Sequence, residues 1–107
     1  MSRSDPFAAL ADPTRRTILE ALRDQPELTA GQIARCFPRV SRAAVSKHLG
    51  VLRRAQLVRA THRGRERHYR LQAERVAKVM EWLESFAPVM EQSLANLKRR
   101  VEGDQKR

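Results

Sequence analysis

The sequence predicts a mainly helical domain with one small β-hairpin, in the order α-α-α-α-β-β-α. Apolar residues recur at threes and fours through most of the chain, which is the spacing of amphipathic helices. Two short alternating runs, at about Val58–His62 and Arg67–Leu71, flank Gly64 and predict the hairpin. A chain of 107 residues is long enough for one domain with a modest core.

Asp-Pro pairs mark the start of the first two helices. Asp5 and Asp12 are N-cap candidates, and the proline after each fits the first helical position. The first helix lies within residues 1–11 and must pack on the core or on another subunit, because so short a helix is unstable in water. The second helix is expected to run to about Asp24, with Ile18, Leu19 and Leu22 inside and Arg15, Arg16 and Arg23 outside.

The third and fourth helices form a helix-turn-helix. Thr29 and Gln32 have the spacing of a capping box, which predicts a third helix that ends before Pro38. The fourth helix is expected over Ser41–Ala55, with Ser41 as its N-cap. Its apolar stripe consists of Val45, Leu49 and Leu52, and its opposite face consists of Ala43, Ser46, Lys47, Gly50 and Arg54. An apolar back and a small, basic front suit a DNA major groove, with a solvated helix face as the alternative.

The predicted hairpin is strongly basic, with arginine at positions 59, 63, 65, 67 and 70. A helix-turn-helix followed by such a hairpin is a winged helix. Its tip, Arg63-Gly64-Arg65, is expected to reach phosphates or the minor groove. For any single wing arginine, a merely solvated charge is the alternative.

The last helical pattern runs from about Ala73 to Val101 and is interrupted by Pro88, which predicts a kink or break near Ala87. It carries more apolar surface than its own core needs, which predicts a dimer interface shared with the first helix; a purely intramolecular core is the alternative. The expected interface residues are Phe7, Leu10, Val79, Trp82, Leu83, Phe86, Met90, Leu94 and Leu97. The single domain is expected over residues 1–102, with a disordered charged tail at 103–107.

The net charge indicates the kind of partner. Lys and Arg number 22 against 12 acids, for a formal charge of +10. This excess predicts an acidic partner, for which nucleic acid is the first candidate and an anionic membrane surface the second. No apolar run approaches the ~20 residues needed to cross a bilayer, and no signal peptide is evident. The sequence therefore predicts a cytoplasmic protein with no membrane partner.

Four stretches, LADPTRRTILEAL, LTAGQIARCF, VSRAAVSKHLGVLRRAQLV and RGRERHYRL, resemble the ArsR/SmtB family of bacterial winged-helix repressors. The resemblance covers about Leu10 to Leu71, and the tail resembles the branch without metal sites. It implies a homodimer with its first and last helices at the interface. It also implies repression by occupying operator DNA, here expected to be an inverted repeat.

The resemblance also implies DNA-facing positions at Ser41, Arg42, Ser46 and Lys47. Arg42 and Ala43 replace a common glutamine and proline, and Gly50 stands where a lysine is usual, so no operator sequence carries over. The complete set of expected DNA-binding residues is Ser41, Arg42, Ala43, Ser46, Lys47, His48, Arg53, Arg54, Arg63, Arg65 and Arg67.

Metal sensing is disfavoured by the same resemblance. Metal-sensing members carry paired cysteines in the third helix, or Asp and His ligands along the last helix. Here Cys36 is the only cysteine, and residues 73–107 contain no His or Cys. His62 and His68 could approach each other across the hairpin, but two exposed imidazoles make a poor site. We expect no metal and no cofactor.

Cys36 itself is expected to be a buried small hydrophobe, with an oxidation switch as the alternative.

Enzymatic function is also disfavoured, because no glycine-rich phosphate loop, Ser/His/Asp arrangement or acidic pair in a cleft stands out. The sequence therefore predicts a metal-independent homodimeric repressor of unknown effector, including one that regulates its own gene. A protein-interaction module is the rival, and a repressor switched by Cys36 oxidation or by a metal at an unrecognised site is the third option.

Overall fold

A computed structural model of the chain describes residues 5–105. Its helices and strands follow in the order α1, α2, β1, α3, α4, β2, β3, α5, α6. The chain divides into two compact units, one through Val76 and one from Ala77 onward.

The caps of the first two helices are confirmed. Helix α1 spans Pro6–Leu10, and the Asp5 carboxylate accepts a hydrogen bond of 3.0 Å from the amide of Phe7. Helix α2 spans Pro13–Asp24, and the Asp12 carboxylate accepts a bond of 3.1 Å from the amide of Arg15. In both helices, the acid satisfies an amide of the first turn that has no partner within the helix.

The helix-turn-helix consists of α3 over Ala30–Arg35 and α4 over Arg42–Arg54. The capping box is present: the amide of Gln32 donates to Thr29 Oγ1 at 3.1 Å, and the Gln32 side chain accepts from the Thr29 amide at 2.8 Å. Ser41 Oγ accepts from the amide of Ala44 at 3.0 Å and fixes the start of α4. The predicted apolar stripe of α4 is buried at all three positions, Val45, Leu49 and Leu52.

Helix α4 ends in a tight reversal that directs the chain into the sheet. The amide of Leu57 donates to the Leu52 carbonyl at 3.0 Å, and the amide of Gln56 donates to the Arg53 carbonyl at 2.9 Å. This is the Schellman pattern, in which the residue after the cap adopts a left-handed conformation. Gln56 has a φ of 63°. Leu52 and Leu57 are both buried, so the reversal is anchored in the core.

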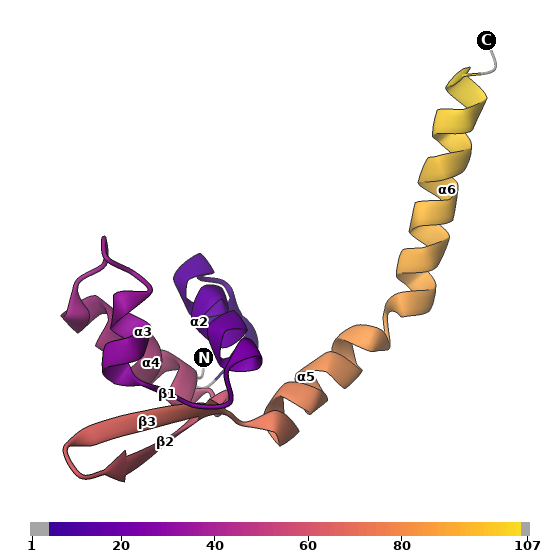
Figure 1. Cartoon of the computed structure of the whole chain (residues 1–107). Helices are drawn as coiled ribbons and strands as arrows, with labels where there is room; N and C mark the ends of the chain where they lie inside the picture. The colour runs from indigo at the N-terminus through magenta and orange to yellow at the C-terminus, as the bar shows by residue number, and fades with distance from the viewer. Residues whose placement is uncertain (1–4, 106–107) are drawn as a thin grey trace. The chain divides into compact units, whose positions relative to one another are not determined.

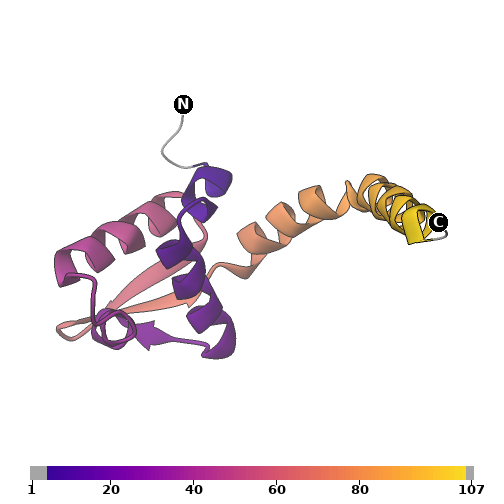
Figure 2. The same ribbon diagram turned by 90° about the horizontal axis from the view of Figure 1, so that it is seen from above.

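The sheet has three antiparallel strands in the order β1-β3-β2. Strands β2 (Val58–Arg63) and β3 (Glu66–Leu71) form the predicted hairpin, and Gly64 in its turn has a φ of +64°. Strand β1 (Leu28–Thr29) pairs with β3, Leu28 opposite Tyr69, and was not expected from the sequence. Helices α2, α3 and α4 lie over one face of the sheet (Figure 1; Figure 2). Buried side chains from this face include Leu28, Val58 and Tyr69.

The second unit contains most of the predicted last helix, in two pieces. Helix α5 spans Ala73–Glu84, α6 spans Ala87–Gln105, and the break falls close to the expected position. Pro88 lies in the first turn of α6, where a missing N–H costs no helical hydrogen bond. The helix includes Gly103, Asp104 and Gln105, where the sequence predicts a disordered tail; the rest of that tail, 106–107, lies outside the described residues.

Large apolar side chains are exposed on α5, on α6 and in the turn between them. Their exposed fractions are between 43% and 64%, at Met80, Trp82, Leu83, Phe86, Val89, Met90, Leu94, Leu97 and Val101. Trp82 packs edge-to-face on Phe86, with ring centroids 4.7 Å apart. None of the helices within residues 5–105 is long and apolar enough to cross a membrane.

Candidate nucleic-acid interface

The outward face of α4 lines a basic hollow of about 350 Å³. All five residues that the sequence places on that face contribute to it, together with Arg53, Arg67 and Tyr69: the lining is Ala43, Ser46, Lys47, Gly50, Arg53, Arg54, Arg67 and Tyr69. None of the described residues that line the hollow is acidic. Four cationic side chains around one polar hollow attract an anion, and forked arginines fit phosphate oxygens well.

In this hollow, the lack of a side chain at Gly50 makes room for the guanidinium of Arg54. One guanidinium nitrogen of Arg54 lies 3.2 Å from the place where a Cβ on residue 50 would be. The absent side chain therefore leaves the space that the Arg54 guanidinium occupies. The Arg54 guanidinium therefore places a positive charge beside residue 50, although the lysine that is usual there in the family that this sequence resembles is absent.

Arg42 is exposed at the first turn of α4 and lies along a separate hollow of about 210 Å³ between α3, α4 and β3. Small residues make room there, since one Arg42 nitrogen is 3.9 Å from where a Cβ on Gly31 would be. Ser46 lines both hollows, and Ser41 is occupied as the N-cap. The structure thus groups Lys47, Arg53 and Arg54, and places Arg42 beside them on the neighbouring hollow.

The two strands of the wing separate its arginines onto opposite faces, because alternate residues of a strand point to opposite sides. Arg67 shares the inner face with Tyr69 and lines the α4 hollow. Its guanidinium donates to His62 Nε2 at 3.1 Å. Arg63 lies on the outer face with His68 and Arg70, and Arg65 is exposed in the turn. His62 and His68 therefore face opposite sides of the hairpin.

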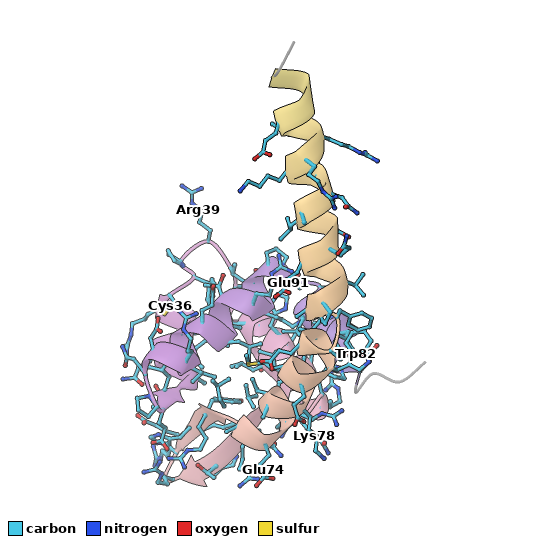
Figure 3. All side chains as sticks on the ribbon, turned by 90° about the vertical axis from the view of Figure 1, so that its right-hand side faces the viewer. Cys36, Arg39, Glu74, Lys78, Trp82 and Glu91 are labelled. Atoms are coloured by element: carbon cyan, nitrogen blue, oxygen red, sulfur yellow. The ribbon has the colours of Figure 1, made fainter. Side chains whose placement is uncertain are left out.

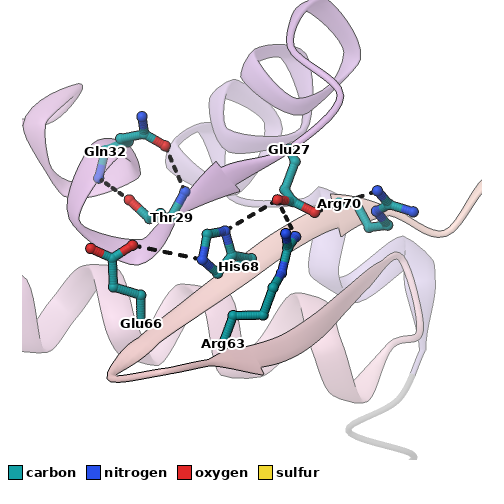
Figure 4. Close-up of polar contacts among 7 residues, drawn as sticks. All are labelled: Glu27, Thr29, Gln32, Arg63, Glu66, His68 and Arg70. Carbon is teal, nitrogen blue, oxygen red and sulfur yellow. Dashed lines mark hydrogen bonds and ion pairs between the residues drawn. The ribbon is translucent and has the colours of Figure 1, made fainter.

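The Glu27 carboxylate lies within ion-pair distance of three side chains on the outer face of the hairpin, as Figure 4 shows. Its carboxylate pairs with Arg63, with Arg70 at 3.4 Å and with His68 Nδ1 at 3.1 Å. The other ring nitrogen of His68 lies 3.6 Å from Glu66. Arg63 is therefore held by a protein carboxylate in this structure, whereas Arg67 is directed toward α4.

The pKa of Glu27 reflects this cluster. Partial burial raises it, but the Arg63 guanidinium, His68 and Arg70 lower it more, so the net shift is downward from the ordinary value of 4.5. A carboxyl group whose pKa is lower in the folded state stabilises the fold above its unfolded pKa. That contribution is lost as the pH falls through the folded pKa.

Replacing Glu27 by glutamine is expected to lower the free energy of unfolding at about pH 7. The deficit should be smaller at about pH 3, because the stabilisation by the wild-type carboxylate is lost as the pH falls through its lowered folded-state pKa. Urea unfolding at both pH values measures the difference. Glu74→Gln, at an exposed carboxylate on α5, is the control and should show no such pH-dependent deficit. A deficit that persists at low pH would assign the loss to packing rather than to charge.

His48 does not face the basic hollow. It is half-buried on α4, and its Nδ1 lies 3.2 Å from a guanidinium nitrogen of Arg15 and 3.9 Å from the Asp12 carboxylate. Arg15 is itself half-buried, whereas the sequence predicts it on the outer face of α2. The difference arises because its guanidinium reaches back to the carbonyls at the end of α1, a contact that helical periodicity does not encode.

Cys36 is exposed, so its expected burial is wrong. Helix α3 ends at Arg35, and Cys36 forms its C-cap at the start of the turn toward α4 (Figure 3). The residue therefore lies beyond the inward stripe of the helix. Within residues 5–105 there is no group of three or more His, Cys, Asp or Glu side chains that could hold a metal ion.

Glu27 and Arg15 are the residues that sequence reasoning missed. Each acts through partners far along the chain, 36 to 43 residues away for the two arginines paired with Glu27, and 33 residues away for the His48 contact of Arg15. The one available signal for Glu27 is a lone acid before the Leu28-Thr29 pair, among many arginines. That signal has meaning only once β1 is known to pair with β3.

Comparison with known proteins agrees with this geometry. Residues 10–61 match the model of a helix-turn-helix domain family. The transcriptional repressor SdpR of Bacillus subtilis is 34% identical over 80 residues, which cover 75% of this chain and 87% of that protein. The HTH-type transcriptional regulator Rv2034 of Mycobacterium tuberculosis is 46% identical over 80 residues, 75% of this chain and 73% of that protein.

A solved structure supports the same assignment. The crystal structure of an ArsR family transcriptional regulator superposes with a TM-score of 0.69 at 30% identity, covering 79% of this chain and 86% of that one. The relatives are named as transcriptional regulators rather than enzymes. The order of elements, the acid-free face of α4 and these similarities agree: the chain belongs to the ArsR/SmtB-type winged helix-turn-helix transcriptional regulators.

Proposed function

We propose that the protein is a homodimeric repressor that occupies an inverted-repeat operator without needing a metal. The observation that carries this proposal is the basic hollow on the outward face of α4, to which Arg67 of the wing contributes. In a dimer, the two α4 helices would enter successive major grooves about 34 Å apart. A bound dimer blocks access of polymerase to the promoter.

The proposed contacts with DNA are of two kinds: some side chains read base edges, and others bind phosphates. Arg42, Ala43 and Ser46, on the N-terminal half of α4, read base edges. Lys47, Arg53, Arg54 and Arg67 bind phosphates from the rim of the hollow. Arg65 contacts the backbone from the wing tip, and Arg63 does so on exchanging Glu27 for a phosphate.

The proposed partner of α5 and α6 is a second copy of the chain. Met90, Leu94 and Leu97 follow one another at helical spacing on α6 and are 57–63% exposed. Large apolar side chains exposed next to one another are typical of an interaction surface rather than of a free surface. Trp82, Leu83 and Phe86 of α5 and the following turn, with Phe7 and Leu10 of α1, complete the proposed interface. Val79, which the sequence also predicts at the interface, is instead buried within the chain.

Two alanine variants test the division of roles on α4. Lys47→Ala is expected to weaken binding of all DNA sequences and to reduce the salt slope by about one. Arg42→Ala is expected to relax preference at one base pair by about 1–3 kcal/mol. Binding titrations at several salt concentrations on matched and single-mismatch duplexes separate the two effects. A Lys47→Ala salt slope equal to that of the wild type would remove Lys47 from the phosphate contacts.

A further inference from the structure

One arginine joins three helices in the first unit. Arg15 of α2 donates through Nε to the Ala9 carbonyl at 2.7 Å and through Nη2 to the Ala8 carbonyl at 3.3 Å. Its remaining nitrogen, Nη1, lies 3.2 Å from His48 Nδ1 on α4. The guanidinium therefore spans the end of α1 and the middle of α4.

On the α1 side of this junction, Arg15 binds carbonyl groups at the end of the helix. The last carbonyls of any α-helix lack partners within the helix. In α1 they are bound by two arginines of α2, because Arg16 also donates to the Leu10 carbonyl, at 2.8 Å. Arg15 is thus immobilised before it reaches His48.

On the α4 side, Arg15 needs a hydrogen-bond acceptor, and the nearby group is Nδ1 of His48. Arginine only donates hydrogen bonds, so this contact is a hydrogen bond in the tautomer of His48 that leaves Nδ1 free to accept. His48 directly follows Lys47 and lies between the buried stripe and the basic hollow, with 21% of its side chain exposed. Asp12, the N-cap of α2, is 3.9 Å from the same ring nitrogen. Its carboxylate is also an acceptor, so in this arrangement Asp12 is not the hydrogen-bond partner of Nδ1.

We propose that Arg15 and His48 are positioning residues for DNA binding: their hydrogen bond sets how α4 is held against α1 and α2. This inference rests on the proposed function. Residues that read base edges must be held to within about 0.5 Å, which packing along one apolar stripe does not ensure by itself. The Arg15–His48 bond supplies a directional constraint beside Lys47. His48 then acts through α4 rather than by touching DNA.

A double-mutant cycle in the full chain tests the proposal. The probes are a duplex with the inverted repeat enriched by the wild-type protein, and a scrambled duplex. Arg15→Met and His48→Leu are each expected to weaken binding of the enriched duplex by about three- to tenfold, the worth of one hydrogen bond. The double variant should bind no more weakly than Arg15→Met, because both changes remove the same bond.

Two controls separate positioning from other roles. Arg16→Met makes the same change of charge on α2 without touching α4 and should leave the preference for the enriched duplex unchanged. His48→Gln restores a neutral acceptor and should recover most of the affinity. Thermal unfolding of each variant identifies losses that come from unfolding alone.

The salt dependence of DNA binding distinguishes a positioning role from direct contact with phosphate. If neither residue touches phosphate, the single variants keep the wild-type salt slope. Additive losses, or a salt slope lower by about 0.9 in His48→Leu, would overturn the inference and make His48 a phosphate contact. A wild-type protein that enriches no sequence would instead overturn the proposed function, and this shows before any variant is compared.

Discussion

Replacing Met90 by glutamate is expected to convert the proposed dimer into monomers. Met90 is 61% exposed on α6, with Phe86 and Leu94 one turn away on the same side. A carboxylate at the centre of an apolar interface loses its hydration without gaining a partner, which costs several kcal/mol. The monomer should also bind operator DNA about 100-fold or more weakly, because two linked half-site contacts become one.

Sedimentation velocity measures the change directly. Gln92→Glu is the matched control, since it adds the same charge to α6 on the side away from Met90, and it should remain dimeric. A Met90→Glu protein that sediments as a dimer would place the interface elsewhere on the chain.

Replacing Leu52 by alanine is expected to cause a large loss of stability. Leu52 is 0% exposed, and its carbonyl accepts the bond from Leu57 that ends α4. Removing a fully buried leucine costs its transfer free energy and leaves a cavity, together about 2–5 kcal/mol. For a domain of this size, that is a large part of the total stability.

Urea unfolding gives the size of the loss. The half-buried neighbour Val51 serves as control, and Val51→Ala should cost clearly less than Leu52→Ala. Equal costs for the two variants would show that the predicted apolar stripe is not what attaches α4 to the core.

Local signals in the sequence predict most of this fold. The caps at Asp5, Asp12, Thr29 and Ser41 involve atoms two or three residues away, so short spacing is enough to identify them. The two faces of α4 follow from helical periodicity, and the outward face coincides with the lining of the basic hollow.

Features that depend on distant pairing could not be predicted. Strand β1 has two residues, too few to show alternation, and exists because Leu28 and Thr29 pair with β3. The Glu27 cluster follows from that pairing. Arg15 looks like a solvent-facing arginine on a helical wheel, and its role emerges only when the end of α1 and His48 lie beside it.

Selection from random duplex DNA by the purified protein, at two salt concentrations and with and without a chelator, tests the central claim most directly. The account predicts enrichment of an inverted repeat whose half-sites lie about one helical turn apart, unaffected by the chelator. Binding that enriches no sequence and disappears at moderate salt would mean that charge alone attracts DNA. That result would contradict the repressor and favour a protein-interaction module.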